Sequence, residues 1–102
     1  MGIGNFLSSI FGGNKMDFNE LIQKGALVID VRSPQEFKSG HLKGSKNIPL
    51  QKLQNSFPTL KNKTVILVCQ SGARSGVAKS KLTQQGINAH NGGAWQNLKN
   101  NN

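Results

Sequence analysis

Cys69 is the only cysteine of this 102-residue chain, and the residues around it suit a nucleophile. It follows the run Thr-Val-Ile-Leu-Val at residues 64–68, which is typical of a strand buried on both faces of a parallel sheet. Cys69 is therefore expected at the carboxyl end of a strand, the edge where open α/β sheets bind ligands. A helix is expected from about residue 74 to residue 85. The free N–H groups and the positive partial charge at its start favour a thiolate over a thiol.

Several chemistries use an accessible thiolate, and the neighbouring residues leave more than one of them open. A cysteine in a buried strand is often a small hydrophobe without a role. Here the residues that follow are too small and polar to bury it; they are Gln70, Ser71, Gly72 and Ala73. Arg74 then adds a fixed cation near the same pocket. A protease, a phosphatase and a redox switch all fit, although the sequence places no histidine as a base and holds no second cysteine.

The charge of the chain favours small anions or an acidic partner over nucleic acid. Lys and Arg number 13 against 4 Asp and Glu, which gives a formal net charge of +9. The lysines are scattered, tyrosine is absent, and no aromatic residues are interleaved with basic ones. The aromatic signature of RNA-binding modules is therefore missing, and we expect no nucleic-acid partner. Attraction of an anionic substrate is the more economical expectation.

The numbers and spacing of cysteine and histidine residues limit which cofactors the chain could bind and which compartment suits it. One cysteine excludes an internal disulfide and a cysteine-rich zinc site. The two histidines and Cys69 have no metal-ligand spacing, so we expect no metal and no cofactor. A reactive free thiol fits a reducing compartment, which predicts a cytoplasmic protein.

The length predicts one small domain at residues 15–99, with an extension at residues 1–14 and a disordered tail at residues 100–102. The extension carries a short apolar stripe with helical spacing, formed by Ile3, Phe6, Leu7, Ile10 and Phe11. We expect this stripe to pack onto the domain surface, and weak contact with a membrane or partner is the alternative. The stretch is too short for stable insertion across a bilayer.

Helix and strand signals alternate along the domain and predict a parallel α/β sheet flanked by helices. Helices are expected from Asp17 to about Lys24, after the cap Ser33 as far as Gly40, at residues 50–57 with a break at Pro58, and at residues 94–98. Strands are expected at residues 26–31 and 64–69, with a weak one at residues 87–90 and a turn at Gly92 and Gly93.

Three segments resemble the rhodanese domain family. Residues 30–49 read DVRSPQEFKSGHLKGSKNIP and are similar to the family segment D-x-R-x-x-x-E-F-x-x-G-H-I-x-G-A-x-N-I-P. The loop CQSGARS at residues 69–75 resembles the family's active-site loop, and GGAW at residues 92–95 resembles its C-terminal glycine pair and tryptophan. The resemblance covers about residues 17–98 in the family's order. It implies a three-layer sandwich with a central, mostly parallel sheet.

The resemblance also implies sulfur transfer. Rhodaneses take a sulfane sulfur from a donor such as thiosulfate onto the cysteine as a persulfide, and pass it to cyanide or a thiol. Carried onto this chain, Cys69 is the persulfide carrier, a small anion is the donor, and a protein thiol is a further acceptor. Four residues separate Cys69 from Arg74. The corresponding loop of rhodanese-fold phosphatases has one residue more between its cysteine and its arginine. The shorter loop suits one sulfur atom rather than a phosphoryl group.

The remaining site residues have supporting roles in this prediction. Arg74 binds the anionic donor and supports the loop, and Ser71 and Ser75 offer hydroxyl groups to the sulfur or serve as helix-start residues. Asp30 and Arg32 orient the loop through hydrogen bonds or an ion pair. The alternative function is a non-catalytic interaction module or a sulfur carrier that docks on a partner.

Overall fold

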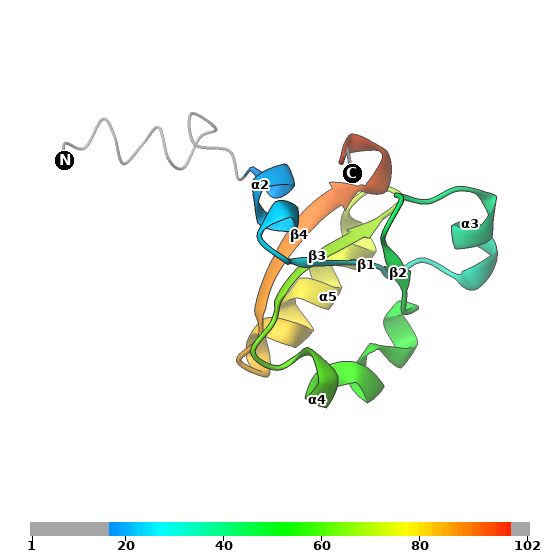
Figure 1. Ribbon diagram of the computed structural model, residues 1–102. Helices are drawn as coiled ribbons and strands as arrows, with labels where there is room; N and C mark the ends of the chain where they lie inside the picture. The colour runs from blue at the N-terminus through cyan, green and yellow to red at the C-terminus, as the bar shows by residue number, and fades with distance from the viewer. Residues whose placement is uncertain (1–16, 99–102) are drawn as a thin grey trace, which may run out of the picture.

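The computed structural model describes residues 17–98. Helices and strands alternate along most of this part of the chain (Figure 1). The elements are α2 (Phe18–Gln23), β1 (Leu27–Asp30), α3 (Pro34–Ser39), β2 (Lys46–Asn47), the 3₁₀ segment η1 (Leu50–Ser56), α4 (Phe57–Leu60), β3 (Thr64–Cys69), α5 (Ala73–Gln84), β4 (Asn88–Ala94) and the 3₁₀ segment η2 (Trp95–Asn97). No helix within residues 17–98 is long and apolar enough to cross a membrane. The expectations for residues 1–14 and 100–102 lie outside the described residues.

The four strands form one parallel sheet in the order β2-β1-β3-β4. The chain leaves β1 for β2 on one side and then returns to β3 on the other side. The direction of the winding therefore changes between the carboxyl ends of β1 and β3. Open α/β sheets bind ligands at such a switch point. The predicted parallel sheet flanked by helices is confirmed.

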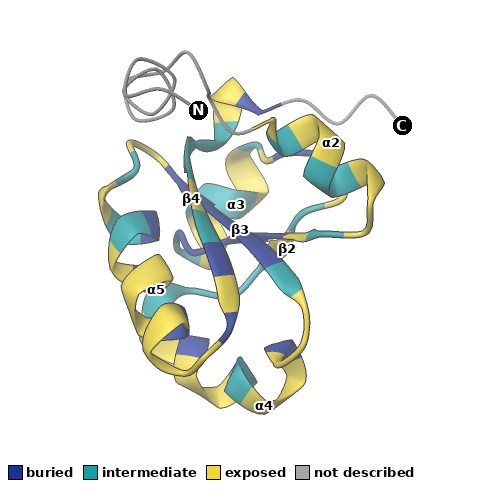
Figure 2. Ribbon diagram, turned by 90° about the vertical axis from the view of Figure 1, so that its left-hand side faces the viewer, coloured by how far each residue is buried: buried dark blue, intermediate teal, exposed yellow. Residues whose placement is uncertain are grey.

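Strand β3 divides its side chains between two apolar layers. Val65, Leu67 and Cys69 face the cluster that contains residues of η1, α4 and α5, and Ile66 and Val68 face the cluster packed by α2. All of β3 after its first residue is buried, as the dark blue ribbon between its neighbours shows (Figure 2). Side chains alternate across a strand, so a strand that is apolar at every position must be covered on both sides. The three-layer sandwich follows from this pattern.

Local capping signals set the start of two helices. Ser33 and Glu36 form a capping box at α3, in which Ser33 Oγ accepts from the Glu36 N–H at 3.1 Å and Glu36 Oε1 accepts from the Ser33 N–H at 3.0 Å. The Asp17 carboxylate accepts from the Glu20 N–H at 3.1 Å and caps α2. The predicted cap at Ser33 is confirmed, and so is the predicted start of a helix at Asp17.

One prediction about chain breaks holds in part and another is wrong. The helix expected at residues 50–57 is the 3₁₀ segment η1, which ends at Ser56, but Pro58 does not end the helical structure. It lies in the first turn of α4, where the missing N–H has no intrahelical partner to lose. Gly92 and Gly93 do not form a turn, because β4 continues through them to Ala94. Gly92 is instead an extra residue at an irregularity opposite Leu67 and Val68. A Cβ at Gly92 would lie only 2.8 Å from Ile66 Cγ2, so this close approach requires glycine.

Candidate active site

Cys69 is the last residue of β3 and pairs with Ala94 of β4. It lies on the face of the sheet packed by α5 and is 1% exposed. The adjacent end of β1 is held close, because the Val31 N–H donates to the Val68 carbonyl at 3.0 Å. The predicted place of the cysteine, at the carboxyl end of a buried strand and before a helix, is confirmed. The expectation that the residues after it are too small and polar to bury it is wrong, because Cys69 packs into the core cluster between the sheet and α5.

The loop between β3 and α5 turns its N–H groups toward the sulfur. Gly72 has a φ of 105°, a left-handed conformation that other residues rarely adopt. Its N–H donates to Cys69 Sγ at 3.0 Å, and the Ser75 N–H donates to the same atom at 3.4 Å. No side chain caps α5 at Gly72. The sulfur therefore takes the place of a capping oxygen for the first turn of this helix.

Hydrogen bonds outweigh burial in setting the pKa of Cys69. Burial raises this pKa, because it disfavours the charged thiolate. The hydroxyl and the N–H of Ser75 lower it, and so do the N–H groups of Gly72 and Ser71. The pKa of Cys69 consequently lies below its ordinary value of 9.0. The loop stabilises a thiolate, as expected of a cysteine at a helix start.

Ser75 connects the sulfur to a residue that the sequence analysis did not identify, Asn91 of β4. Ser75 Oγ lies 3.4 Å from Cys69 Sγ and donates to Asn91 Oδ1 at 2.6 Å. Asn91 Nδ2 donates to the carbonyl of Gly72 at 3.1 Å. The predicted strand ended at residue 90. Extending it would have placed Asn91 on the same face as the buried Ala89, because side chains alternate along a strand.

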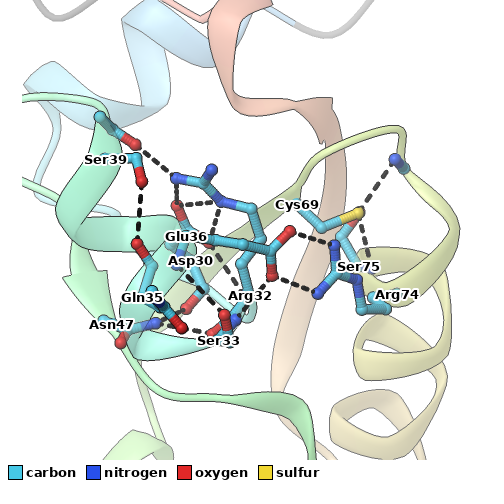
Figure 3. A network of polar contacts seen from close by, with 12 residues as sticks. Asp30, Arg32, Ser33, Gln35, Glu36, Ser39, Asn47, Cys69, Arg74 and Ser75 are labelled. Carbon is cyan, nitrogen blue, oxygen red and sulfur yellow. Dashed lines mark hydrogen bonds and ion pairs between the residues drawn. The ribbon is translucent and has the colours of Figure 1, made fainter.

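Arg74 is held by Glu36 of α3, beside the cysteine loop (Figure 3). Arg74 Nη1 donates to Glu36 Oε1 at 2.8 Å, and Nη2 donates to Oε2 at 3.0 Å. The hydrogen bonds from Arg74 and from the Ser33 N–H lower the pKa of Glu36 from 4.5 to about 2, and the contact with Glu36 raises the pKa of Arg74. Glu36 lies in the family-like segment but was not predicted as a site residue. Donor binding by Arg74 stays a prediction.

Asp30 and Arg32 form a buried ion pair at the end of β1, with Arg32 Nη2 2.8 Å from Asp30 Oδ2. Arg32 Nη2 also donates to the Gly40 carbonyl at 2.7 Å, and its guanidinium lies 4.9 Å from the ring centroid of Trp95. The ion pair therefore holds the segment after α3 and the start of η2. A role in orienting the loop after Cys69 stays a prediction.

The other predicted loop residues lie on the outer side of the turn: Gln70, Ser71 and Ala73 are exposed. His41 is exposed, stacks on Phe37 with ring centroids 3.7 Å apart, and contacts the Phe37 carbonyl through Nδ1 at 2.7 Å. Within residues 17–98, no group of three or more His, Cys, Asp or Glu side chains is placed to hold a metal ion.

Comparison with known proteins gives matches along most of the chain. The family model of the Rhodanese-like domain matches residues 15–99. An uncharacterized protein of Bacillus subtilis, YqhL, is 44% identical over 62 residues, which cover 60% of this chain and 49% of YqhL. The thiosulfate sulfurtransferase PspE of Escherichia coli is 39% identical over 61 residues, covering 57% of this chain and 59% of PspE. The chain thus spans about half the length of these two relatives.

The fold agrees with these sequence matches. A solved structure of a rhodanese with anions from E. coli is similar to this one with a TM-score of 0.69 and 32% identity, over 74% of this chain and 94% of that chain. The family match covers Cys69, its loop, and both ion pairs around it. On these matches, the chain belongs to the rhodanese-like domain family.

Proposed function

We propose that this protein is a rhodanese-type sulfurtransferase, which takes a sulfane sulfur onto Cys69 as a persulfide and passes it to a thiophilic acceptor. The observation that carries the proposal is the pair of N–H groups aimed at Cys69 Sγ, from Gly72 at 3.0 Å and from Ser75 at 3.4 Å. Such a nest of N–H groups stabilises negative charge on the sulfur before and after transfer. The name of PspE, a thiosulfate sulfurtransferase, supports this reaction class.

The chemistry proceeds through a covalent intermediate. The Cys69 thiolate attacks the sulfane sulfur of thiosulfate, and a new S–S bond forms. The S–S bond of thiosulfate breaks, and sulfite leaves with the bonding electron pair. Cyanide or a thiolate then attacks the outer sulfur of the persulfide, and the electron pair returns to Cys69. No oxidant or reductant is consumed in this cycle with cyanide, which leaves as thiocyanate.

Sulfur chemistry is favoured over phosphoryl chemistry by where the N–H groups point. A phosphoryl group bound by a cysteine loop sits beyond the sulfur and needs donors around its own oxygens. Here the N–H groups of Gly72 and Ser75 converge on Sγ itself. The short loop between Cys69 and Arg74 is consistent with this arrangement.

A reactive free thiol also supports the cytoplasm as the compartment of this protein.

Mass spectrometry of the full chain tests the proposal. After incubation with thiosulfate, Cys69 is expected to gain about 32 Da, the mass of one sulfur atom, and to lose it again when cyanide is added. The Cys69→Ser variant should gain no mass and produce no thiocyanate. An aryl phosphatase activity that depends on Cys69, with no gain of sulfur, would replace the proposal by phosphoryl transfer.

The sulfur-carrier alternative keeps one specific observation in its favour. The guanidinium of Arg74, the cation beside the loop, is already paired with Glu36, which reduces the charge it offers to a small anionic donor. A carrier would receive its sulfur from another persulfide instead. Loading of Cys69 by a persulfide donor but not by thiosulfate is the result expected of a carrier. Failure to load from both donors would indicate an interaction module.

A further inference from the structure

We propose that Asn91 is a positioning residue that directs the single hydroxyl proton of Ser75 away from Cys69, and so controls how readily the sulfur ionises. The inference deepens the proposed sulfur chemistry, for which the thiolate is the reactive form. It names a residue outside the predicted loop, on β4. Its basis is a chain of three side chains, Cys69, Ser75 and Asn91, whose hydrogen-bond directions are fixed by the backbone around them.

The orientation of the Asn91 amide follows from two backbone groups. The Gly93 N–H can only donate, and it donates to Asn91 Oδ1 at 2.9 Å. The Gly72 carbonyl can only accept, and Asn91 Nδ2 donates to it at 3.1 Å. A flipped amide would lose both hydrogen bonds. The oxygen of the amide therefore faces Ser75, and it can only accept.

The irregularity in β4 supplies one of these two groups. Leu67 pairs with Asn91, Val68 pairs with Gly93, and Gly92 is left over between them. At this irregularity the Gly93 N–H points to the Asn91 side chain, and Gly93 itself has a left-handed φ of 80°. Bulges of this kind recur next to active sites, where they re-aim groups of the strand. The amide of Asn91 is thus fixed although the residue itself is exposed.

The Ser75 hydroxyl has two possible acceptors for its one proton, Asn91 Oδ1 and Cys69 Sγ. Ser75 is fully buried, so water does not compete for this proton. Asn91 Oδ1 lies 2.6 Å from Ser75 Oγ, whereas Cys69 Sγ lies 3.4 Å from it. A hydroxyl has one proton to donate, and the short contact with the amide oxygen takes it. Ser75 then presents a lone pair to the sulfur, which suits a thiol that donates its own proton.

Ionisation of Cys69 reverses this preference. A thiolate can only accept, so the Ser75 hydroxyl must rotate toward the sulfur and give up its hydrogen bond to Asn91 Oδ1. No proton crosses from one residue to another in this rotation. Asn91 therefore opposes formation of the thiolate through Ser75, while the N–H groups of Gly72 and Ser75 favour it. The hydroxyl proton held by Asn91 and the two N–H groups therefore act on the ionisation of Cys69 in opposite directions.

Charged groups around the sulfur are the same whether or not Asn91 is present. Arg74 on α5 is electrostatically coupled to Cys69 and to Asp30 on β1, and it is paired with Glu36 on α3. Asn91 is neutral, and its hydrogen bonds go to the Ser75 hydroxyl, the Gly72 carbonyl and the Gly93 N–H rather than to any of these charged side chains. A neutral substitution of Asn91 consequently leaves the charges around the sulfur unchanged, and a Ser75→Ala background separates the hydroxyl proton from the contacts with Gly72 and Gly93.

The test is the pH dependence of the alkylation rate of Cys69 by iodoacetamide in the full chain, which needs no sulfur donor. Asn91→Leu has nearly the size of Asn91 but no acceptor. We expect it to move the midpoint of the profile down by about 0.5–1 pH unit, the order of one hydrogen bond between neutral groups. In a Ser75→Ala background the same substitution should leave the midpoint unchanged. Equal shifts in both backgrounds would mean that Asn91 acts through the Gly72 carbonyl, and would overturn the proposal.

A second variant covers the case in which Asn91→Leu does not fold. Asn91→Asp keeps an acceptor toward Ser75 and holds its proton more strongly. Its midpoint should rise more with Ser75 present than in the Ser75→Ala background, where only the added charge acts. An equal rise in both backgrounds would overturn the proposal. Failure of sulfur loading would affect the proposed function without changing any of these midpoints, so the two ideas fail separately.

Discussion

The guanidinium of Arg74 and the carboxylate of Glu36 form a two-point ion pair across 38 positions of sequence, with N–O distances of 2.8 and 3.0 Å. Glu36 Oε1 also accepts from the Ser33 N–H at 3.0 Å. One carboxylate therefore completes the capping box of α3 and binds Arg74 in the first turn of α5, the turn in which the Ser75 N–H donates to the sulfur. The position of the cysteine loop depends on a helix that is distant in sequence.

Glu36 should make stability depend on acidity in a defined window. Its pKa is lowered from 4.5 to about 2 in the folded protein, first by Arg74 and then by the Ser33 N–H. Because the folded pKa is the lower one, the carboxylate stabilises the fold fully above pH 4.5 and loses this contribution as the pH falls toward about 2. Urea unfolding midpoints should therefore fall more steeply in the wild type than in Glu36→Gln over that range. Parallel curves would contradict the assignment.

Removing Arg32 should destabilise the fold strongly. Asp30 and Arg32 are 0% and 3% exposed, so Arg32→Met leaves a buried carboxylate without its partner. We expect a loss of about 3–5 kcal/mol in the free energy of unfolding, measured in urea. Lys24→Met is the matched control, because it breaks the exposed pair with Glu20 and should cost about 1 kcal/mol or less. Similar losses in the two variants would show that burial does not decide the effect.

Gly92→Ala should strain β4. The added Cβ would lie 2.8 Å from Ile66 Cγ2 and 3.1 Å from Val68 Cγ1, both in the closely packed layer under α2. Overpacking of this kind costs about 1–3 kcal/mol in the free energy of unfolding. The cost should shrink when Ile66→Leu removes the methyl branch, which a double-mutant cycle measures. An unchanged cost in the Ile66→Leu background would place the strain elsewhere.

Cys69 should react as a thiolate at a lower pH than an ordinary cysteine. Its folded pKa lies below 9.0, because the hydrogen bonds from Ser75 and the loop N–H groups exceed the effect of burial. The midpoint of the alkylation profile in the folded protein should consequently lie below that of the same chain unfolded in urea. Coinciding midpoints would show that the loop does not stabilise the thiolate.

The sequence predicted the elements whose signals are local. The apolar run of β3 identified a strand buried on both faces, and the capping box of Ser33 and Glu36 identified the start of α3. Local sequence signals gave the wrong prediction where a contact between distant residues sets the backbone conformation. Gly92 and Gly93 read as a turn, but a glycine in a strand can also mark a bulge that approaches a neighbouring side chain.

The site was predictable around Cys69 and less so beyond it. The cysteine, its loop and Arg74 are consecutive or nearly so, and the structure places them together. Glu36 and Asn91 come from other elements, and their contacts with Arg74 and Ser75 depend on the order of the strands. The sequence next to Glu36 or Asn91 does not indicate these partners. Contacts of this kind can be identified only once the order of the strands in the sheet is known.

The extra residue in β4 has a second consequence, for association between molecules. β4 has 7 residues and is one edge of the sheet within the described part of the chain. A long, regular edge is a template for a strand of another molecule. Gly92 interrupts the even spacing of N–H and C=O groups along β4, and a bulge increases the local twist. A strand from another molecule would lose its hydrogen-bond register at this point. The glycine pair that orients the Asn91 amide therefore also disfavours edge-to-edge aggregation.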